Sequence, residues 1–322
     1  MPGQPLVSRT ALFCVATLLF ACSGPDGDDA GLDAGPDSGS VGAGDANVDA
    51  TVCTPTAAEP FLCEDMTPDP ACPASWVVGV TGRVETAAGV GVENARAQFC
   101  VRLYPDDRLV CLAPPRTDAN GDFVIIVPLE LRCLNRAAMR AIAPGMPFAT
   151  SYCPVVFPAG SDPVFNITEP YVVHPVTAAT VPPVGDETAA RDVVFDSGLV
   201  LNLAPDDFVT QDYLELAGAS VPVAATSCFA DGVSIDGAYV FKPEDEITGG
   251  AAVSIPNTTG LAPGAVVDLR ILGGLETRQL DGTEVEEGEL ALIGTATVSA
   301  DGTMLVGDNR VPYLSWLLWT AR

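Results

Sequence analysis

Histidine is almost absent from this chain of 322 residues, which contains only His174. A zincin needs two histidines on one helix face, and a Ser-His-Asp or Cys-His site needs a histidine held by a carboxylate. The sequence also lacks the G-x-S-x-G motif of α/β-hydrolases. Zincin-type proteases are therefore excluded. His174 precedes Pro175 in an apolar, proline-rich stretch, and we expect it to be a surface or edge residue without a catalytic role.

Positive charge is scarce as well. Lysine and arginine total 15 against 42 aspartates and glutamates, which gives a formal net charge of −27, and Lys242 is the one lysine. Such a chain repels phosphate backbones and anionic head groups. We therefore expect no nucleic-acid partner, and nothing in the sequence points to a cofactor.

No apolar run is long enough to cross a bilayer, which takes about 20 residues. The longest at the N-terminus is residues 10–21, which follows Arg9 and reads as the apolar region of a signal peptide. The residues Leu19-Phe20-Ala21-Cys22 resemble the lipobox of bacterial lipoproteins, although Phe20 is larger than is usual there. The resemblance implies cleavage of a signal peptide at 1–21 and lipidation, with palmitate-type acyl chains, of Cys22. The alternative is a plain secretory signal in which Cys22 is incidental.

Residues 22–52 are rich in Gly, Ala and Asp and have too little apolar surface to fold. We interpret them as a disordered tether between the anchored cysteine and a folded body. Ser23 stands where, in some bacteria of this lipoprotein class, an aspartate retains the product at the inner membrane. This favours the outer membrane, on either its periplasmic or its surface face.

Cysteine usage supports export. Of ten cysteines, Cys14 is removed with the signal peptide and Cys22 is lipidated, which leaves an even set of eight. No C-x-x-C pair occurs, so a structural zinc site is poorly supported and disulfides are favoured. Their pairing stays open, because eight cysteines allow 105 combinations. The eight candidates are Cys53, Cys63, Cys72, Cys100, Cys111, Cys133, Cys153 and Cys228.

Helical periodicity is nearly missing after Trp76, where short β-branched runs alternate with Gly, Pro, Asn and Asp. The sequence predicts an all-β fold of two β-sandwich-type domains. We expect a Cys/Pro-rich lead-in at 53–75, a first domain at 76–185 and a second at 186–322. Within the second, residues 192–203 are a candidate strand pair.

Three local predictions are specific enough to check. A polar turn at 105–108 predicts a hairpin that brings Cys100 near Cys111 without placing the two directly opposite. The apolar run 123–128 is typical of a buried strand. Residues 129–135 fit a helical turn, whereas 137–142 alternate like a strand.

Residues 80–145 resemble the carboxypeptidase regulatory-like domain, a transthyretin-like sandwich. The match begins with Gly82-Arg83-Val84 and continues with Gly89, Val92 and Ala95. It then takes in the turn formed by Thr117-Asp118, Gly121 and Phe123, and closes with Ala143-Pro144-Gly145. The resemblance implies a folding, spacing or binding module and brings no catalytic residues. Insertions at 111–115 and 129–134 depart from the family pattern.

The second domain resembles the ZU5-like β domains of bacterial surface proteins. The resemblance rests on the strand 237–243, an apolar strand at 252–256 that ends in Pro, a turn and hairpin at 260–269, and Val298-Ser299-Ala300-Asp301-Gly302. The His-Phe-Ser step that often closes such domains is replaced by residues 311–319.

Other side chains could carry chemistry, and each has a plainer interpretation. The carboxylates at Asp206-Asp207 and Glu244-Asp245-Glu246 could serve a glycoside hydrolase, but a solvated loop is favoured. The oxygen-rich segment 118–122 fits a turn better than a calcium loop. Of the C-terminal aromatics, Tyr313 and Trp319 share one strand face and Trp316 lies on the other. Core packing is preferred to a sugar platform for these rings.

The sequence therefore predicts a non-enzymatic, lipid-anchored cell-surface protein with a binding or scaffolding role toward an unknown protein or polysaccharide partner. The alternatives are a carbohydrate- or peptide-binding lipoprotein of an uptake or adhesion system and a glycoside hydrolase that uses paired carboxylates.

Overall fold

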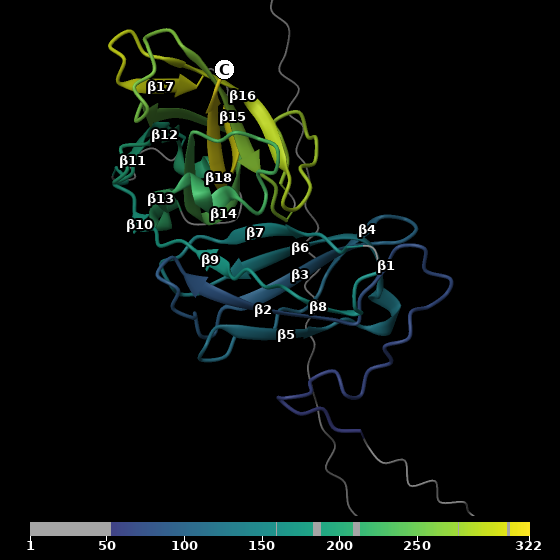
Figure 1. The fold of residues 1–322 in the computed structure, drawn as a ribbon. Coiled ribbons are helices and arrows are strands. Elements are labelled where there is room, and N and C mark those ends of the chain that lie inside the picture. The colour runs from purple at the N-terminus through teal and green to yellow at the C-terminus, as the bar shows by residue number, and fades with distance from the viewer. Residues whose placement is uncertain (1–52, 159, 183–187, 209–212, 276, 308–309) are drawn as a thin grey trace, which may run out of the picture. The chain divides into compact units, whose positions relative to one another are not determined.

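Short apolar runs between turn residues become strands throughout the part of the chain that the structure describes, as the all-β prediction requires (Figure 1). The computed structural model describes residues 53–158, 160–182, 188–208, 213–275, 277–307 and 310–322. Helical segments among these residues are 3₁₀ turns of three or four residues. The predicted signal peptide, Cys22 and the tether lie outside the described residues.

The first half, which we term the N-terminal sandwich, consists of two facing sheets. One has the order β1-β6-β3-β4, with β7 also paired to β6, and the other has the order β5-β2-β8, with β9 also paired to β2. Its strands are β1 (Ser75–Trp76), β2 (Gly79–Thr86), β3 (Arg96–Leu103), β4 (Arg108–Cys111), β5 (Asp122–Ile126), β6 (Cys133–Ile142), β7 (Ser151–Val155), β8 (Val164–Asn166) and β9 (Tyr171–Val173).

Alternating side chains of both sheets fill the space between them. Phe99 and Met139 from one sheet and Val80 and Ile125 from the other belong to one buried cluster. Such alternation is what one-sided burial of a strand requires. Burial of these residues stabilises the sandwich by about 1.5–3 kcal/mol for each large side chain.

The turn before β5 explains the residue types at 117–123. The Asp118 carboxylate accepts hydrogen bonds from the backbone N–H groups of Asn120 and Asp122 at 2.8 and 2.9 Å. Gly121 has a φ of +85°, and a Cβ there would lie 2.2 Å from the carbonyl oxygen of Val84. Only glycine fits this position, and the hydrogen bonds of the aspartate close the turn.

The second half, which we term the C-terminal sheet, contains nine strands. Its path runs β10-β13-β14-β17-β16-β15-β18, and β14 also pairs with β12 and with β18. Its strands are β10 (Thr177–Ala178), β11 (Arg191–Val194), β12 (Val200–Leu203), β13 (Ala217–Val221), β14 (Gly237–Pro256), β15 (Val266–Leu272), β16 (Leu290–Val298), β17 (Met304–Gly307) and β18 (Val311–Ala321). The predicted strand pair at 192–203 is present as β11 and β12.

Pairing of β14 with β18 closes part of this sheet into a ring. β14 pairs with β17, β17 with β16, β16 with β15, and β15 with β18, which returns to β14. The ring encloses apolar residues that include Leu269, Leu317 and Trp319. Closure removes the free edges that a flat sheet would expose.

The outer face of β14 and β18 packs against the sandwich, and we term this contact the junction. Its buried cluster joins Ala149 and Tyr152 to Val240, Trp316 and other residues of the C-terminal sheet. The indole N–H of Trp316 donates to the Thr150 carbonyl at 2.9 Å. Because β18 is buried on both faces, residues 311–319 are almost entirely apolar.

The lead-in has one internal disulfide, and it is fixed to the sandwich by a second disulfide and by Arg132. Cys53 pairs with Cys63, and Cys72 pairs with Cys133 of β6. The buried Arg132 donates to the Glu64 carboxylate and to the carbonyl oxygens of Asp65 and Val127.

Two further disulfides complete the set of eight cysteines. Cys100 pairs with Cys111 inside one hairpin, and Cys153 pairs with Cys228 across the junction. The prediction that Cys100 and Cys111 are not directly opposite is wrong, because they are register partners. The reason is that the loop starts one residue earlier than predicted. The N–H of Asp107 donates to the Leu103 carbonyl at 2.8 Å, and Asp107 has a φ of +55°.

The other local predictions need adjustment as well. β5 is an edge strand with one face in solvent, so Val124 and Ile126 are about 40% exposed rather than buried. The ambiguous region divides into a 3₁₀ turn at Leu129–Leu131 and the strand Cys133–Ile142. β10 lies inside the predicted first domain, yet it pairs with β13 of the C-terminal sheet. The chain therefore changes sheets between Val173 and Thr177.

Removal of the junction disulfide is expected to destabilise the protein more than removal of the hairpin disulfide. The sequence separations are 75 and 11 residues, and the longer closed loop restricts the unfolded chain more. We expect a loss of about 4 kcal/mol for Cys153→Ala/Cys228→Ala and about 3 kcal/mol for Cys100→Ala/Cys111→Ala. Urea unfolding of both double variants measures the difference. A larger loss for the hairpin pair would contradict this ranking.

Candidate functional site

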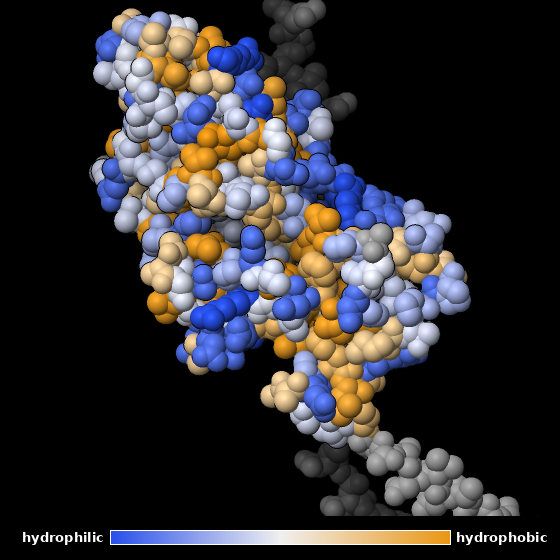
Figure 2. Space-filling view, viewed as in Figure 1, coloured by the Kyte–Doolittle hydropathy of each residue, from blue (hydrophilic) through white to orange (hydrophobic). Residues whose placement is uncertain are grey.

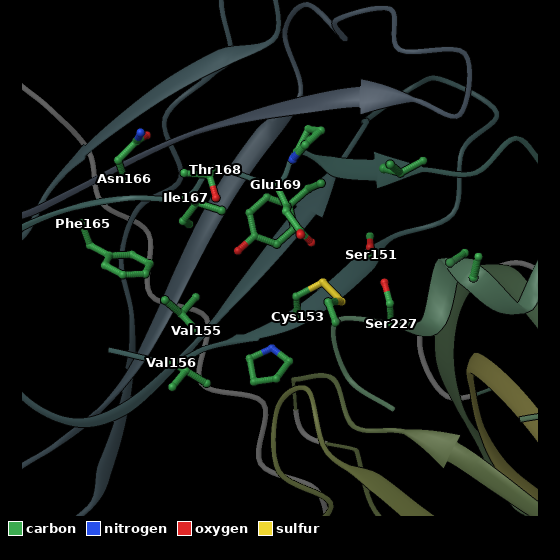
Figure 3. Close-up of a pocket in the computed structure, with 17 residues that line it drawn as sticks. Ser151, Cys153, Val155, Val156, Phe165, Asn166, Ile167, Thr168, Glu169 and Ser227 are labelled. Atoms are coloured by element: carbon green, nitrogen blue, oxygen red, sulfur yellow. A yellow bond between two sulfur atoms is a disulfide. The ribbon is translucent and has the colours of Figure 1, made fainter. Parts of the chain in front are cut away.

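A pocket of about 530 Å³ opens beside the Cys153–Cys228 disulfide (Figure 3). Three segments form its walls, two of them close together in the sequence and the third more than 50 residues further on. They are β7 with the residues that follow it, the segment 165–172 that links β8 to β9, and the stretch 224–228 from the C-terminal sheet. The disulfide ties the first segment to the third, so it fixes the width of the pocket.

The pocket lies where the edges of the two sandwich sheets separate. Among the described strands, β7 pairs only with β6, and both β8 and β9 pair only with β2. Asn166, at the end of β8, accepts a hydrogen bond from the Thr81 hydroxyl at 2.9 Å. Pro154 interrupts the β7 edge and has no N–H to offer an added strand.

The walls combine apolar surface with a few polar groups. Val155, Phe165 and Ile167 line one side, and Val156 is 76% exposed at the rim. Hydroxyl groups come from Ser151, Thr168 and Ser227, and Figure 3 shows the Glu169 carboxylate among them. Glu169 is the one charged residue of the lining. A mixed lining of this kind suits a small ligand.

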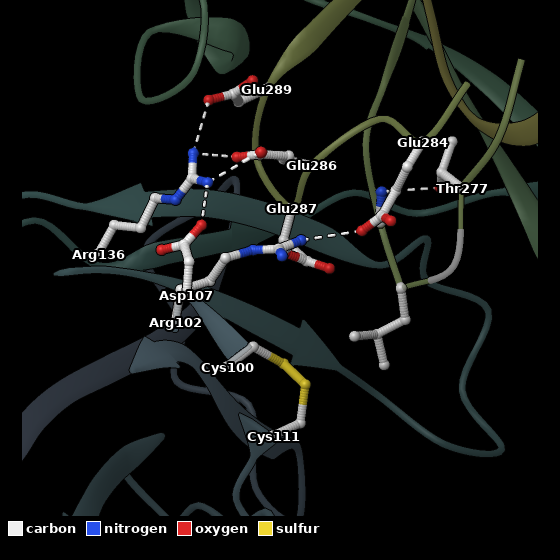
Figure 4. A network of polar contacts seen from close by, with 12 residues as sticks. Cys100, Arg102, Asp107, Cys111, Arg136, Thr277, Glu284, Glu286, Glu287 and Glu289 are labelled. Carbon is white, nitrogen blue, oxygen red and sulfur yellow. Dashed lines mark hydrogen bonds and ion pairs between the residues drawn. A yellow bond between two sulfur atoms is a disulfide. The ribbon is translucent and has the colours of Figure 1, made fainter. Parts of the chain in front are cut away.

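A second polar region joins the sandwich to the loop before β16 (Figure 4). Arg102 of β3 lies 2.9 Å from Glu284 and 3.3 Å from Glu287. Burial raises the pKa of Glu287, while Arg102 opposes the shift. Arg136 of β6 contacts Asp107, Glu286 and Glu289. Since the guanidinium groups are already engaged by carboxylates, this network serves as a crosslink.

Glu244 corrects the expectation of a solvated acidic loop. It lies in β14, its side chain is 7% exposed, and it accepts from Arg140 at 2.6 Å and from the Tyr152 hydroxyl at 3.2 Å. Burial raises the pKa of Glu244, and Arg140 and the hydrogen bonds of Tyr152 and Thr150 oppose that rise. Burial, followed by the charge of Glu244, holds the pKa of Tyr152 well above its usual value. This buried pair joins β6 and β7 to β14.

His174 is also placed differently from the prediction. It is 6% exposed, and its ring packs edgewise against Trp316 with centroids 5.6 Å apart. Burial lowers the pKa of His174. The lone histidine is therefore a junction residue rather than a surface residue.

The remaining predicted candidates do not come together in one place. Asp206 and Asp207 lie in a 3₁₀ turn, where Asp207 accepts from the backbone N–H of Ala204 at 2.7 Å. Trp316 and Trp319 are each 1% exposed, so neither ring is available as a sugar platform. Within the described residues no group of three or more His, Cys, Asp or Glu side chains is arranged to hold a metal ion.

Among the described residues, a second hollow beside Trp76 has a similar volume of about 490 Å³, but no charged side chain lines it. Apolar and polar residues are interspersed over the face seen in Figure 2. The hollow beside Trp76 is bounded mainly by loops. A further hollow beside Arg102 is bounded by the ion network of Figure 4. No helix among the residues described could span a membrane.

Comparison with known proteins does not assign the chain to a family, since no protein-family model and no curated protein matches it. The function must therefore be argued from the geometry. Sequence reasoning missed Glu169 and Arg140, which stand among ordinary turn and strand residues. The sequence does offer one sign that Glu244 lies in a strand rather than a loop. Lys242-Pro243-Glu244 directly follows an apolar strand, and no glycine between them marks a turn.

The free energy of unfolding is expected to fall as the pH drops below 6.5 because of His174. Its folded pKa lies below the usual value of 6.5, so the unfolded chain takes up the proton first on acidification. Above pH 6.5 the imidazole is neutral in both states and contributes no difference. The loss is at most about 1.4 kcal/mol for each pH unit.

Urea unfolding at several pH values measures this effect. His174→Gln is expected to lose less stability than the wild type below pH 6.5, since the variant lacks the imidazole and keeps every carboxylate of the wild type. An NMR titration of the single imidazole checks the cause directly. A measured pKa above 6.5 would refute the assignment.

Proposed function

We propose that this protein is an exported, lipid-anchored bacterial binding protein, held in the outer membrane through Cys22. The observation that carries the proposal is the pairing of the eight cysteines that follow the tether into four disulfides. Disulfides persist in oxidising compartments and are rare in the cytosol. With the signal-like segment and Cys22 ahead of them, they favour a folded body outside the cytoplasm.

The pocket beside Cys153–Cys228 supports binding rather than catalysis as the role of this body. Its polar groups are hydroxyls, one amide and one carboxylate, without a histidine or a second carboxylate to act as a general base or acid. The buried Glu244 and His174 lie in the junction, where they engage neighbouring side chains. We therefore propose a non-catalytic role toward a small molecule or a side chain of a larger partner.

The two family resemblances belong to this proposal. The two facing sheets of residues 75–173, in which β8 and β9 run parallel to β2 and the other strand pairs are antiparallel, support the regulatory-like resemblance, as does the glycine-dependent turn at Gly121. The C-terminal sheet supports the resemblance to the ZU5-like β domains of bacterial surface proteins. β18 closes its ring and occupies the place of the His-Phe-Ser step that often ends such domains. The regulatory-like resemblance implies a folding, spacing or binding module, and the second resemblance implies a β domain of a bacterial surface protein.

Metabolic labelling with a fatty-acid analogue in a Gram-negative host tests the anchor. The wild type is expected to be labelled and to fractionate with the outer membrane, because Cys22 would supply the acylated thiol. Cys22→Ala is expected to lose the label, and Cys14→Ala is the matched control that keeps it. Undiminished labelling of Cys22→Ala would overturn the proposed anchor.

A further inference from the structure

We infer that the pocket beside Cys153–Cys228 takes a ligand that carries a cationic amino group on an apolar stem. This inference rests on the proposed binding function and specifies the chemistry of the site. It depends on three features of the lining: its charge, its apolar wall and the interrupted strand edge.

The charge of the pocket is negative and uncompensated within its lining. Glu169 is the one ionised side chain among the 17 lining residues drawn in Figure 3, and no lysine, arginine or histidine lines the pocket. The whole chain carries a formal charge of −27. Such a field attracts cations toward the opening and disfavours anionic ligands.

The apolar wall fits the stem of such a ligand. Val155, Val156 and Ile167 offer aliphatic surface next to Phe165. The Phe165 ring is held at 73° to Phe157, with centroids 5.1 Å apart. An aromatic face attracts a cation as well as an alkyl chain. The oxygens of Ser151, Thr168 and Ser227 can accept further hydrogen bonds from an ammonium group.

The β7 edge argues against an added peptide strand as the main mode of binding. Strand addition depends on a row of backbone donors and acceptors. Pro154 removes one donor in the middle of β7, and the Cys153–Cys228 disulfide ties the edge to the stretch 224–228. Insertion of a side chain or small molecule into the pocket is the mode that these residues favour.

NMR titration with three probes of six carbon atoms each tests the inference. The probes are hexylamine, which is protonated at neutral pH, 1-hexanol and hexanoate, each added to the exported chain carrying Cys22→Ala. We expect hexylammonium to shift the methyl resonances of Val155, Val156 and Ile167. It should bind about fivefold tighter than hexanol, with hexanoate weakest, since a partly exposed ion pair contributes this much.

Three variants separate local charge from the general field of the protein. Glu169→Gln is expected to reduce hexylammonium binding to the level of hexanol and to leave hexanol binding unchanged. Glu130→Gln, which removes an exposed glutamate outside the pocket lining, is the matched control and should change neither. Val156→Ser is expected to weaken all three probes by a similar factor.

The outcomes distinguish this inference from the proposed function. Equal binding of the three probes in the pocket, or an unchanged preference in Glu169→Gln, would overturn the cation inference and leave the binding function standing. A failure of all three probes to shift the pocket resonances would count against both. Loss of the preference in Glu130→Gln would show that the overall field, rather than Glu169, attracts the cation.

Discussion

The junction between β7 and the outer face of β14 and β18 is the contact on which the rest of the structure depends. An apolar cluster around Tyr152 and Trp316, the buried pair of Arg140 and Glu244, and the Cys153–Cys228 disulfide meet there. Burial of the ion pair is costly unless its hydrogen bonds are satisfied, and removal of one partner would leave a charge in an apolar contact. The pair therefore specifies how the halves meet more than it adds net stability.

The pocket is a consequence of the same contact. Its third wall comes from residues 224–228, and these lie against the sandwich because Cys228 is bonded to Cys153. The adjacent Phe229 packs on Trp316 of β18 with ring centroids 5.1 Å apart, and Trp316 in turn donates to the Thr150 carbonyl. Without the junction, the gap between the edges of β7 and β8 would lack the wall that residues 224–228 supply. The proposed binding site and the stability of the junction thus depend on the same disulfide.

The sequence predicts the fold class and many strands, because alternation and turn residues are local signals. The pair at 192–203 and the glycine turn at 117–123 are examples. It does not predict the environment of Glu244 or His174, since burial of a polar residue is decided by partners far away in the chain, here Arg140 and Trp316. The pocket is missed for the same reason, because residues 224–228 are brought to residues 151–172 only by the fold and none of these segments carries a motif.

Native-state hydrogen exchange tests most directly whether the junction unites the halves. The account predicts that the slowest amides of β6 in the sandwich and of β18 in the C-terminal sheet exchange with the same free energy of opening and the same dependence on urea, because both require global unfolding. Two groups with different free energies, one for each half, would contradict it. In that case the halves would be independent domains, and the pocket could not be a fixed feature of the protein.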